Sequence, residues 1–336
     1  MGARRIALTV PDAAISADNL VRHFGTVEAL RGVSFHVDTG TVLGLLGPNG
    51  AGKTTAVRIL TTLLRADGGE ARVLGIDVAA EPARVRAIIG LAGQYAAVDE
   101  NLTARENLRL VGRLTHLPYR RIRARGDELL ERFELADAAD RLVRTFSGGM
   151  RRRLDLAAAL VHNPPVLFLD EPTTGLDPYG RTELWRVIEE LVASGTTLLL
   201  TTQYLEEADR LANNIVVIDH GQIIAEGTST ELKAQLGATV IEVAFATNEA
   251  AAAAASHLAP IGSVDIDGKE LRMTVANGAS AMLETVRVLD ADQLEPVTMA
   301  LREPTLDDVF LSLTGHAAEE PTEDGDGTAA PRRRAR

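Results

Sequence analysis

A glycine-rich loop between an apolar run and a helical pattern constrains the fold of this chain most strongly. Its residues are Gly47-Pro48-Asn49-Gly50-Ala51-Gly52-Lys53-Thr54, and they follow the apolar run 43–46. Glycines at 47, 50 and 52 let the backbone bend until successive N–H groups point inward at an oxyanion. The following helix adds its positive N-terminal end. This strand–loop–helix unit predicts an α/β protein with a phosphate-binding loop, because a chance glycine turn rarely has all three parts.

An acidic pair closes a second apolar run. Asp170 and Glu171 directly follow the run 166–169. A carboxylate at the end of a buried strand can hold magnesium through water, and the carboxylate beside it can serve as general base for an attacking water. The alternative is an acidic pair that caps a helix before the turn at Pro172. Beside a phosphate loop, the pair is better interpreted as the second half of one ATP site.

Short apolar runs alternate with helical patterns along the chain, which predicts a mostly parallel sheet covered on both faces. The runs interpreted as buried strands are 41–46, 87–91, 166–169, 197–201 and 215–218. Apolar residues at helical spacing predict a helix between two of these strands, and Gly195 can end it. The members of that apolar stripe are Leu184, Val187, Ile188 and Leu191. Residues 18–37 are more typical of edge or hairpin strands.

Residues 96–162 lack strand patterns and are rich in Leu, Arg and Glu. Thr103 and Glu106 have the spacing of a capping box, which predicts the start of a helix. This stretch is interpreted as a helical subdomain inserted between the two halves of the nucleotide site.

The chain after Gly227 predicts a separate β-α-β-β-α-β unit of the ferredoxin-like type. Its predicted elements are strand 239–245, helix 249–257, paired strands 263–266 and 271–275, helix 280–289 and strand 296–301. Thr305 and Asp308 then predict the cap of a last helix. Its apolar face is predicted to hold Leu306, Val309, Phe310 and Leu313. The polar tail 317–336 is predicted to be disordered.

Composition excludes several classes of protein. A length of 336 residues allows two or three domains, and the absence of cysteine excludes a disulfide framework and a thiolate metal site. The N-terminal extension, residues 1–16, has no apolar run long enough for a signal peptide, and no run approaches the ~20 residues that span a bilayer. A formal net charge of −12 argues against nucleic acid as the main partner.

Two further motifs complete an ordered set. Gln94 follows the loop, and Ser147-Gly148-Gly149 precedes the acidic pair. The set resembles the ATP-binding-cassette (ABC) ATPases over residues 17–230. The resemblance implies a P-loop NTPase with a RecA-like core, an antiparallel β subdomain and an inserted helical subdomain. It also implies ATP and Mg²⁺ as cofactors, and a second copy of the chain as partner, because the Ser-Gly-Gly element completes the ATP site of a facing subunit.

The resemblance implies roles for individual residues at the phosphates. Lys53 would reach the β- and γ-phosphates and Thr55 the α-phosphate. Thr54 would ligate magnesium directly and Asp170 through water, while Gln94 would touch both magnesium and the attacking water. Across the dimer the γ-phosphate would meet Ser147, Gly148 and Gly149.

Three more positions follow from the resemblance. Asp177, in the loop Gly175-Leu176-Asp177, would sense the other subunit. Phe24 stands where the family places a ring that stacks on adenine, although core packing is an alternative for a single Phe. Gln203 replaces the histidine that usually contacts the γ-phosphate, and it cannot carry a positive charge near neutral pH. Hydrolysis should therefore depend more on Glu171.

The three arginines 151–153 lie in the first turn of the helix predicted over 151–160, where positive charge opposes the helix dipole. They serve either an anionic neighbour or a solvated basic face, and the sequence leaves both open.

Segments 146–158, 201–209 and 301–310 are similar to the daunorubicin-resistance ATPase subfamily. This implies an ATPase that energises export of hydrophobic antibiotics or lipids through a separate ABC-2 type permease, at the cytoplasmic face of the cell membrane. A C-terminal domain, 231–316, would stabilise or regulate the dimer. The alternatives are a glycolipid or polysaccharide exporter, a soluble ATPase of translation or repair, and a drug-sequestering protein.

Overall fold

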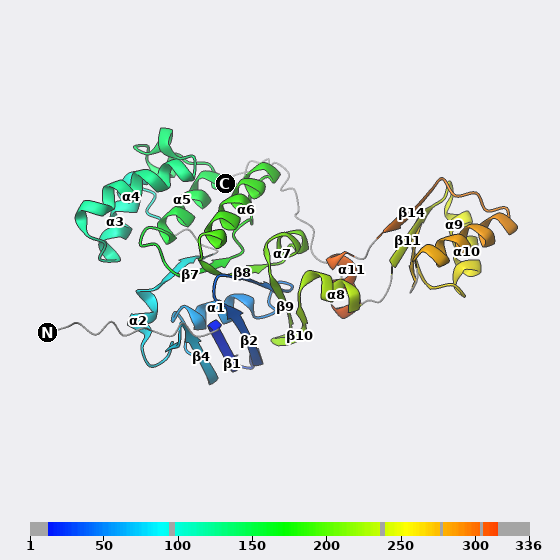
Figure 1. Cartoon of the computed structure of the whole chain (residues 1–336), viewed down its shortest axis with the longest axis horizontal. Coiled ribbons are helices and arrows are strands. Elements are labelled where there is room, and N and C mark those ends of the chain that lie inside the picture. Colours follow the sequence, from blue (N-terminus) through cyan, green and yellow to red (C-terminus); the bar gives the residue numbers. More distant parts are fainter. Residues whose placement is uncertain (1–12, 94–97, 236–238, 276–277, 303–304, 315–336) are drawn as a thin grey trace, which may run out of the picture.

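A computed structural model describes residues 13–93, 98–235, 239–275, 278–302 and 305–314 (Figure 1). A six-stranded sheet lies at the centre, in the order β10-β9-β3-β8-β7-β6. Its strands are β3 (Val42–Leu46), β6 (Ile89–Ala92), β7 (Val166–Asp170), β8 (Thr197–Thr202), β9 (Asn214–Asp219) and β10 (Gln222–Gly227). All pairings are parallel except that of the edge strand β10. The five predicted strands are confirmed, and β10 was not predicted.

Helices cover both faces of this sheet, which explains its continuous apolar strands. Leu167 and Leu169 point into one buried cluster, with helices α5 (Gly148–Ala159) and α6 (Pro178–Ala193). Val166 and Phe168, on the opposite face, point into a second cluster with α1 (Lys53–Leu60). Successive strand side chains alternate between faces, so each strand must be apolar on both. Gly195, with φ +96°, follows the end of α6 as predicted.

An antiparallel sheet in the order β2-β1-β4-β5 packs on the second cluster. The predicted hairpin is confirmed as β1 (Ala13–Phe24) and β2 (Val27–Asp38), whereas β4 (Gly68–Val73) and β5 (Ile76–Asp77) were not predicted. A short helix, α2 (Pro82–Arg86), leads from this sheet to β6.

The predicted helical insertion holds α3 (Ala104–Leu114), α4 (Tyr119–Arg132), two short 3₁₀ turns (Ala136–Ala138 and Val143–Thr145) and α5. The capping box of α3 is confirmed. The Glu106 N–H donates to Thr103 Oγ1 at 3.2 Å, and the Thr103 N–H donates to Glu106 Oε2 at 2.9 Å. These bonds satisfy backbone donors that the first helical turn leaves unpaired.

The third sheet has the order β12-β13-β11-β14, with antiparallel pairing throughout. Its strands are β11 (Thr239–Ala244), β12 (Ser263–Asp267), β13 (Glu270–Val275) and β14 (Thr298–Arg302), and its helices are α9 (Asn248–Leu258) and α10 (Gly278–Ala291). This order confirms the predicted ferredoxin-like unit. The sheet and its two helices form a lobe that stands apart from the other two sheets (Figure 1).

The last helix, α11 (Leu306–Thr314), packs on the nucleotide-binding part of the chain beside α7 (Leu205–Leu211) and α8 (Ser229–Gln235), not on the third sheet (Figure 1). The Thr305 N–H donates to Asp308 Oδ2 at 2.8 Å, which confirms the predicted cap. Leu306, Val309 and Phe310 are buried as predicted. The prediction for Leu313 is wrong: its side chain is 40% exposed, because the buried stripe ends one turn earlier.

None of the helices in the described ranges combines the length and the apolar character needed to cross a bilayer.

Candidate nucleotide-binding site

The phosphate loop joins β3 to α1 through a backbone that only small residues can follow. Gly50 and Gly52 have φ of +82° and +112°. A Cβ on Gly47 would lie 2.1 Å from the carbonyl oxygen of Ile218 on β9, closer than real Cβ contacts come. The loop glycines are therefore required by conformation at two positions and by a close backbone approach at the third.

Lys53 is buried inside the loop that it follows. Its Nζ donates to the carbonyl oxygens of Gly47 at 2.7 Å and Pro48 at 3.0 Å, and the side chain is 4% exposed. The same ammonium lies 3.6 Å from Glu171 Oε1. The positive charge is therefore fixed between the loop backbone and the acid pair, and a bound anion would find it already in place.

The acid pair lies directly opposite the loop. Asp170 Oδ1 accepts hydrogen bonds from Thr54 Oγ1 at 3.1 Å and from Thr201 Oγ1 at 2.6 Å. The Glu171 N–H donates to Thr201 O at 3.1 Å and to Thr201 Oγ1 at 3.0 Å. Asp170 therefore bonds to side chains of α1 and β8 instead of capping a helix. The structure thus brings the two predicted halves of the site together.

A cavity of about 210 Å³ is lined by the phosphate loop and, from the acid pair, by Glu171. Its walls are Ala29, Asn49, Gly50, Ala51, Gly52, Lys53, Thr54, Thr55 and Glu171. Backbone N–H groups at the start of α1, the Lys53 ammonium and two hydroxyl side chains suit a polyphosphate. Among the described residues that line the cavity, Glu171 alone carries a carboxylate.

Ser147 lies outside that cavity, at the N-terminus of α5. Its Oγ accepts the Met150 N–H at 3.3 Å, so the helix begins at Gly148 and not at residue 151 as predicted. A Cβ at Gly148 would meet no atom within 4 Å. The Ser-Gly-Gly element is thus an open helix N-terminus, separate from the phosphate loop of the same chain.

Each of the three arginines after this element has its own acidic partner. Arg151 lies 2.9 Å from Glu100, and Arg153 lies 3.0 Å from Glu134. Arg152 lies 3.6 Å from the buried Asp155. All three arginines therefore have anionic neighbours within the chain, but only Arg152 is buried, whereas the side chains of Arg151 and Arg153 stay 37% and 29% exposed on a solvated face.

Two other predicted residues occupy loops at element ends. Asp177 is the N-cap of α6, and its Oδ1 accepts the Gly180 N–H at 2.8 Å. Phe24 ends β1 and is 46% exposed, with the Arg22 guanidinium 4.9 Å from the ring centroid. Core packing therefore does not explain this ring, which is free on one side to stack on a ligand.

Of the two predicted glutamines, the structure describes Gln203 but not Gln94. Gln203 lies between β8 and α7, and its buried Oε1 has no hydrogen-bond partner among the described residues. A buried carbonyl oxygen without a partner suits a hydrogen-bond donor that arrives with a ligand, such as a water molecule. Gln94 lies outside the described residues, so its predicted contacts with magnesium and water are not addressed by the structure.

Sequence reasoning missed two residues beside the site. Thr201 holds both Asp170 and Glu171, and its only signal was a hydroxyl at the end of an apolar strand. Glu207 on α7 is fully buried, and its Oε1 accepts the Trp185 Nε1–H at 3.2 Å. Burial raises the pKa of Glu207, and hydrogen bonds from neighbouring side chains and the nearby Arg152 oppose the rise only partly.

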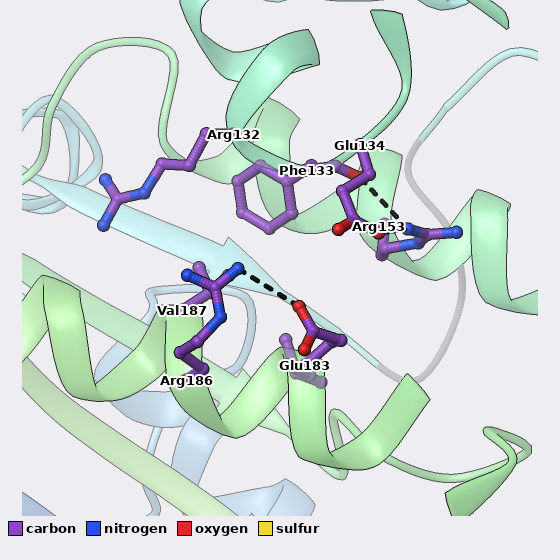
Figure 2. Close-up of a pocket in the computed structure, with 8 residues that line it drawn as sticks. Arg132, Phe133, Glu134, Arg153, Glu183, Arg186 and Val187 are labelled. Atoms are coloured by element: carbon purple, nitrogen blue, oxygen red, sulfur yellow. Dashed lines mark hydrogen bonds and ion pairs between the residues drawn. The ribbon is translucent and has the colours of Figure 1, made fainter. Parts of the chain in front are cut away.

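The seam between the helical insertion and α6 holds charged pairs instead of a ligand site (Figure 2). Arg153 bonds to Glu134 on one side, and Arg186 bonds to Glu183 at 3.1 Å on the other. The cavity between them has a volume of about 10 Å³, room for no more than one water.

The loop, the buried lysine and the acid pair define a P-loop nucleotide-binding cassette. Residues 30–174 match the family model of the ABC transporter domain, and residues 227–314 match the DrrA1-3-like ATP-binding protein C-terminal domain. The chain is 55% identical to the daunorubicin resistance ATP-binding protein DrrA3 of Streptomyces coeruleorubidus, over 90% of this chain and 96% of the relative. It is 48% identical to the daunorubicin/doxorubicin resistance ATP-binding protein DrrA of Streptomyces peucetius, over 93% and 96%.

A solved dimeric ATP-binding cassette in a post-hydrolysis state with ADP and Pi matches with a TM-score of 0.60 at 25% identity, covering 64% of this chain and 98% of that one. The chain therefore belongs to the ATP-binding proteins of ABC transporters, in the group with a DrrA-like C-terminal domain. As a member of this family it is an ATP-hydrolysing enzyme.

Proposed function

We propose that this chain is the ATP-hydrolysing subunit of an exporter that energises efflux of a hydrophobic drug or antibiotic through a separate ABC-2 type membrane permease. The single observation that carries the enzymatic part is the junction of phosphate loop and acid pair, with Lys53 Nζ 3.6 Å from Glu171 Oε1 in one cavity. The drug class rests on the drug-resistance names of relatives that cover nearly the whole chain. The alternatives are a soluble ATPase and a glycolipid exporter, and identification of the partner protein tests them.

In this proposal each residue of the cavity has one task. Backbone N–H groups of residues 47 and 49–53 and the Lys53 ammonium bind the β- and γ-phosphates, and Thr55 binds the α-phosphate. Phe24 stacks on the adenine, where its exposed face is available. Glu171 accepts the proton of the attacking water. Gln203 lies beside that water, which can donate to its unpartnered Oε1, and its amide NH₂ could donate to the γ-phosphate.

The cavity also fits Mg²⁺. Thr54 Oγ1 and Asp170 Oδ1 lie 3.1 Å apart, and such oxygen atoms, few in number and completed by substrate phosphates and water, suit this cation. Gln94 would add an amide oxygen. Magnesium would supply charge neutralisation at the β- and γ-phosphates, whereas the chain's own residues hold the nucleotide and remove the proton.

A second copy of the chain completes each site in this proposal. Ser147, Gly148 and Gly149 form an open helix N-terminus that does not line the chain's own phosphate cavity. An anion brought by a facing copy fits that N-terminus. Asp177, at the start of α6, would then lie at the boundary between the copies and sense their approach.

The proposed domains are a cassette over 17–230, with its helical subdomain at 96–162, and a dimer-stabilising or regulatory domain over 231–316. Residues 13–16, the end of the predicted N-terminal extension 1–16, open β1 and so belong to the cassette, whereas the flanking tail 317–336 belongs to neither domain. The permease would dock near Gln94 and the helical subdomain, which places the chain at the cytoplasmic face of the cell membrane.

The test uses the Glu171→Gln variant. Loss of a positioned base lowers turnover by about 10²–10⁴-fold while ATP binding is retained, so the variant should accumulate as an ATP-bound dimer of twice 35.9 kDa. Glu206→Gln, at an exposed glutamate of α7, is the matched control and should turn over like wild type.

The same variant identifies the partner. Glu171→Gln with ATP is captured from gently solubilised native membranes and analysed by mass spectrometry. Recovery of one multi-helix permease supports the proposal. Recovery of ribosomal or repair proteins without a permease contradicts it, and near-normal single-turnover hydrolysis by Glu171→Gln contradicts the role of the base.

A further inference from the structure

Arg152 extends from helix α5 to the backbone that carries the acid pair, outside the lining of the phosphate cavity. Its guanidinium is nearly enclosed, with the side chain 11% exposed. Nε donates to Pro172 O at 2.7 Å, and Nη2 donates to Asp170 O at 3.1 Å and to Glu171 O at 3.0 Å. Nη1 donates to the carbonyl oxygen of Gly93, next to the end of β6. A guanidinium is the one side chain whose planar fork can bond several carbonyls at once.

Three of these acceptors are consecutive and carry the acid pair. Glu171 itself has φ +49°, in the left-handed region that a residue with a Cβ rarely adopts. Thr201 fixes this residue through its N–H, and Arg152 fixes it through its carbonyl oxygen. The backbone of Glu171, which orients its carboxylate, is thus restrained at its N–H and at its carbonyl oxygen. The first restraint comes from the central sheet and the second from helix α5.

The charge of Arg152 is balanced inside the protein. Asp155, one turn further along α5, is 1% exposed and lies 3.6 Å from the guanidinium. Burial lowers the pKa of Arg152, while the carboxylates of Asp155, Asp170, Glu207 and Glu171 oppose the change. Removal of the guanidinium would take a donor from each of four carbonyl oxygens in a buried region, which is costly.

The position of Arg152 on α5 connects the acid pair to the Ser-Gly-Gly element at the start of the same helix. Ser147 caps α5, and Arg152 follows five residues later on the same short, stiff element. In the proposed dimer, Ser147 meets the γ-phosphate held by the partner subunit, whereas Glu171 serves the chain's own nucleotide. One helix therefore touches both ATP sites.

We propose that Arg152 is a positioning residue that couples the two ATP sites, because it ties the backbone of Glu171 to the helix whose N-terminus serves the opposite site. This inference rests on the proposed dimeric ATPase. Binding of phosphate at the start of α5 moves Arg152 with the helix and sets the Glu171 carboxylate in its own site. Hydrolysis at one site then depends on occupancy of the other.

The experiment compares Arg152→Gln, Arg152→Lys and the control Arg153→Gln. Arg153 lies next in sequence, but its guanidinium bonds to Glu134 and the Phe133 carbonyl, on the outer seam (Figure 2). Steady-state hydrolysis is measured against ATP concentration to give kcat, KM and the Hill coefficient, and nucleotide affinity is measured separately. Melting followed by Trp185 fluorescence identifies any variant that does not fold.

A misplacement of 1 Å can cost about 100-fold in rate, so Arg152→Gln should lower kcat at least about tenfold, with nucleotide affinity nearly unchanged. Its Hill coefficient should fall towards 1. Arg152→Lys keeps the positive charge but has fewer hydrogen-bond donors than arginine, so it should recover only part of kcat. Arg153→Gln should retain wild-type kcat and Hill coefficient.

Mixed dimers with one Arg152→Gln subunit separate coupling from a local defect. Coupling predicts a kcat close to that of the doubly substituted dimer, because each site needs both subunits. A kcat midway between the two parent dimers, or an unchanged Hill coefficient, overturns the inference. If wild type and Arg153→Gln do not hydrolyse ATP as dimers, the proposed function fails and the coupling fails with it.

Discussion

Phe310 provides a sharp test of where the end of the chain packs. Its side chain is 4% exposed, in a cluster with Leu46, Leu205 and Val217. Leu46 is the residue directly before the phosphate loop. Although Phe310 lies beyond the C-terminal sheet in sequence, Phe310→Ala should therefore destabilise the nucleotide-binding cassette.

The expected loss follows from the burial. Truncation of an enclosed Phe to Ala removes its transfer free energy and leaves a cavity, which together cost about 3–5 kcal/mol. At about 2–4 °C per kcal/mol for a unit of this size, the melting temperature should fall by roughly 6–20 °C. The chain has a single tryptophan, Trp185, which lies in the separate cluster under α6. Its fluorescence reports unfolding of the cassette and not of the C-terminal sheet.

Leu313→Ala is the matched control on the same helix. Leu313 is 40% exposed, so Leu313→Ala should lower the free energy of unfolding by much less than Phe310→Ala does. Equal shifts for the two variants, or no shift of the Trp185 transition with Phe310→Ala, would refute the packing of α11 on the cassette.

Two further predictions concern stability. Burial raises the pKa of Glu207 above the ordinary 4.5, so the folded state keeps its proton to higher pH than the unfolded chain. The free energy of unfolding should then fall as pH rises above 4.5, by about 1.4 kcal/mol per unit until the folded pKa is passed. Glu207→Gln should remove this fall in urea titrations between pH 4 and 8; parallel curves for the two proteins would contradict it. Thr103→Ala removes the capping box of α3 and should cost about 0.5–2 kcal/mol in urea unfolding, whereas Thr115→Ala at the other end of that helix should cost less, and equal losses would show that the cap contributes nothing special.

The central sheet was predictable because its strands are buried on both faces, and a continuous apolar run records that directly. The edge strand β10 and the strand β4 escaped prediction, because alternate residues face solvent and charges interrupt the pattern. The capping box of Thr103 was also predictable, because its two partners, Thr103 and Glu106, lie three residues apart in the sequence.

The site was predictable where one short segment carries the chemistry, as in the phosphate loop and the Asp170–Glu171 pair. Contacts between distant segments were not. Thr201 lies 31 residues from Asp170, and Arg152 lies 59 from Gly93, so no spacing rule connects them. The stripe on α11 likewise indicated a buried face without indicating its partner or where along the helix the burial ends, so the exposure of Leu313 was not predicted.

The C-terminal sheet is topologically an insertion and not an appendage. Leu232 of α8 precedes it, Val309 and Phe310 of α11 follow it, and all three lie in one apolar cluster beneath the end of β3. Both ends of the lobe are therefore anchored to the same patch of the ATPase. Between the anchors its sequence is free to diverge or to be exchanged for another module without exposing that patch, provided that α11 is kept.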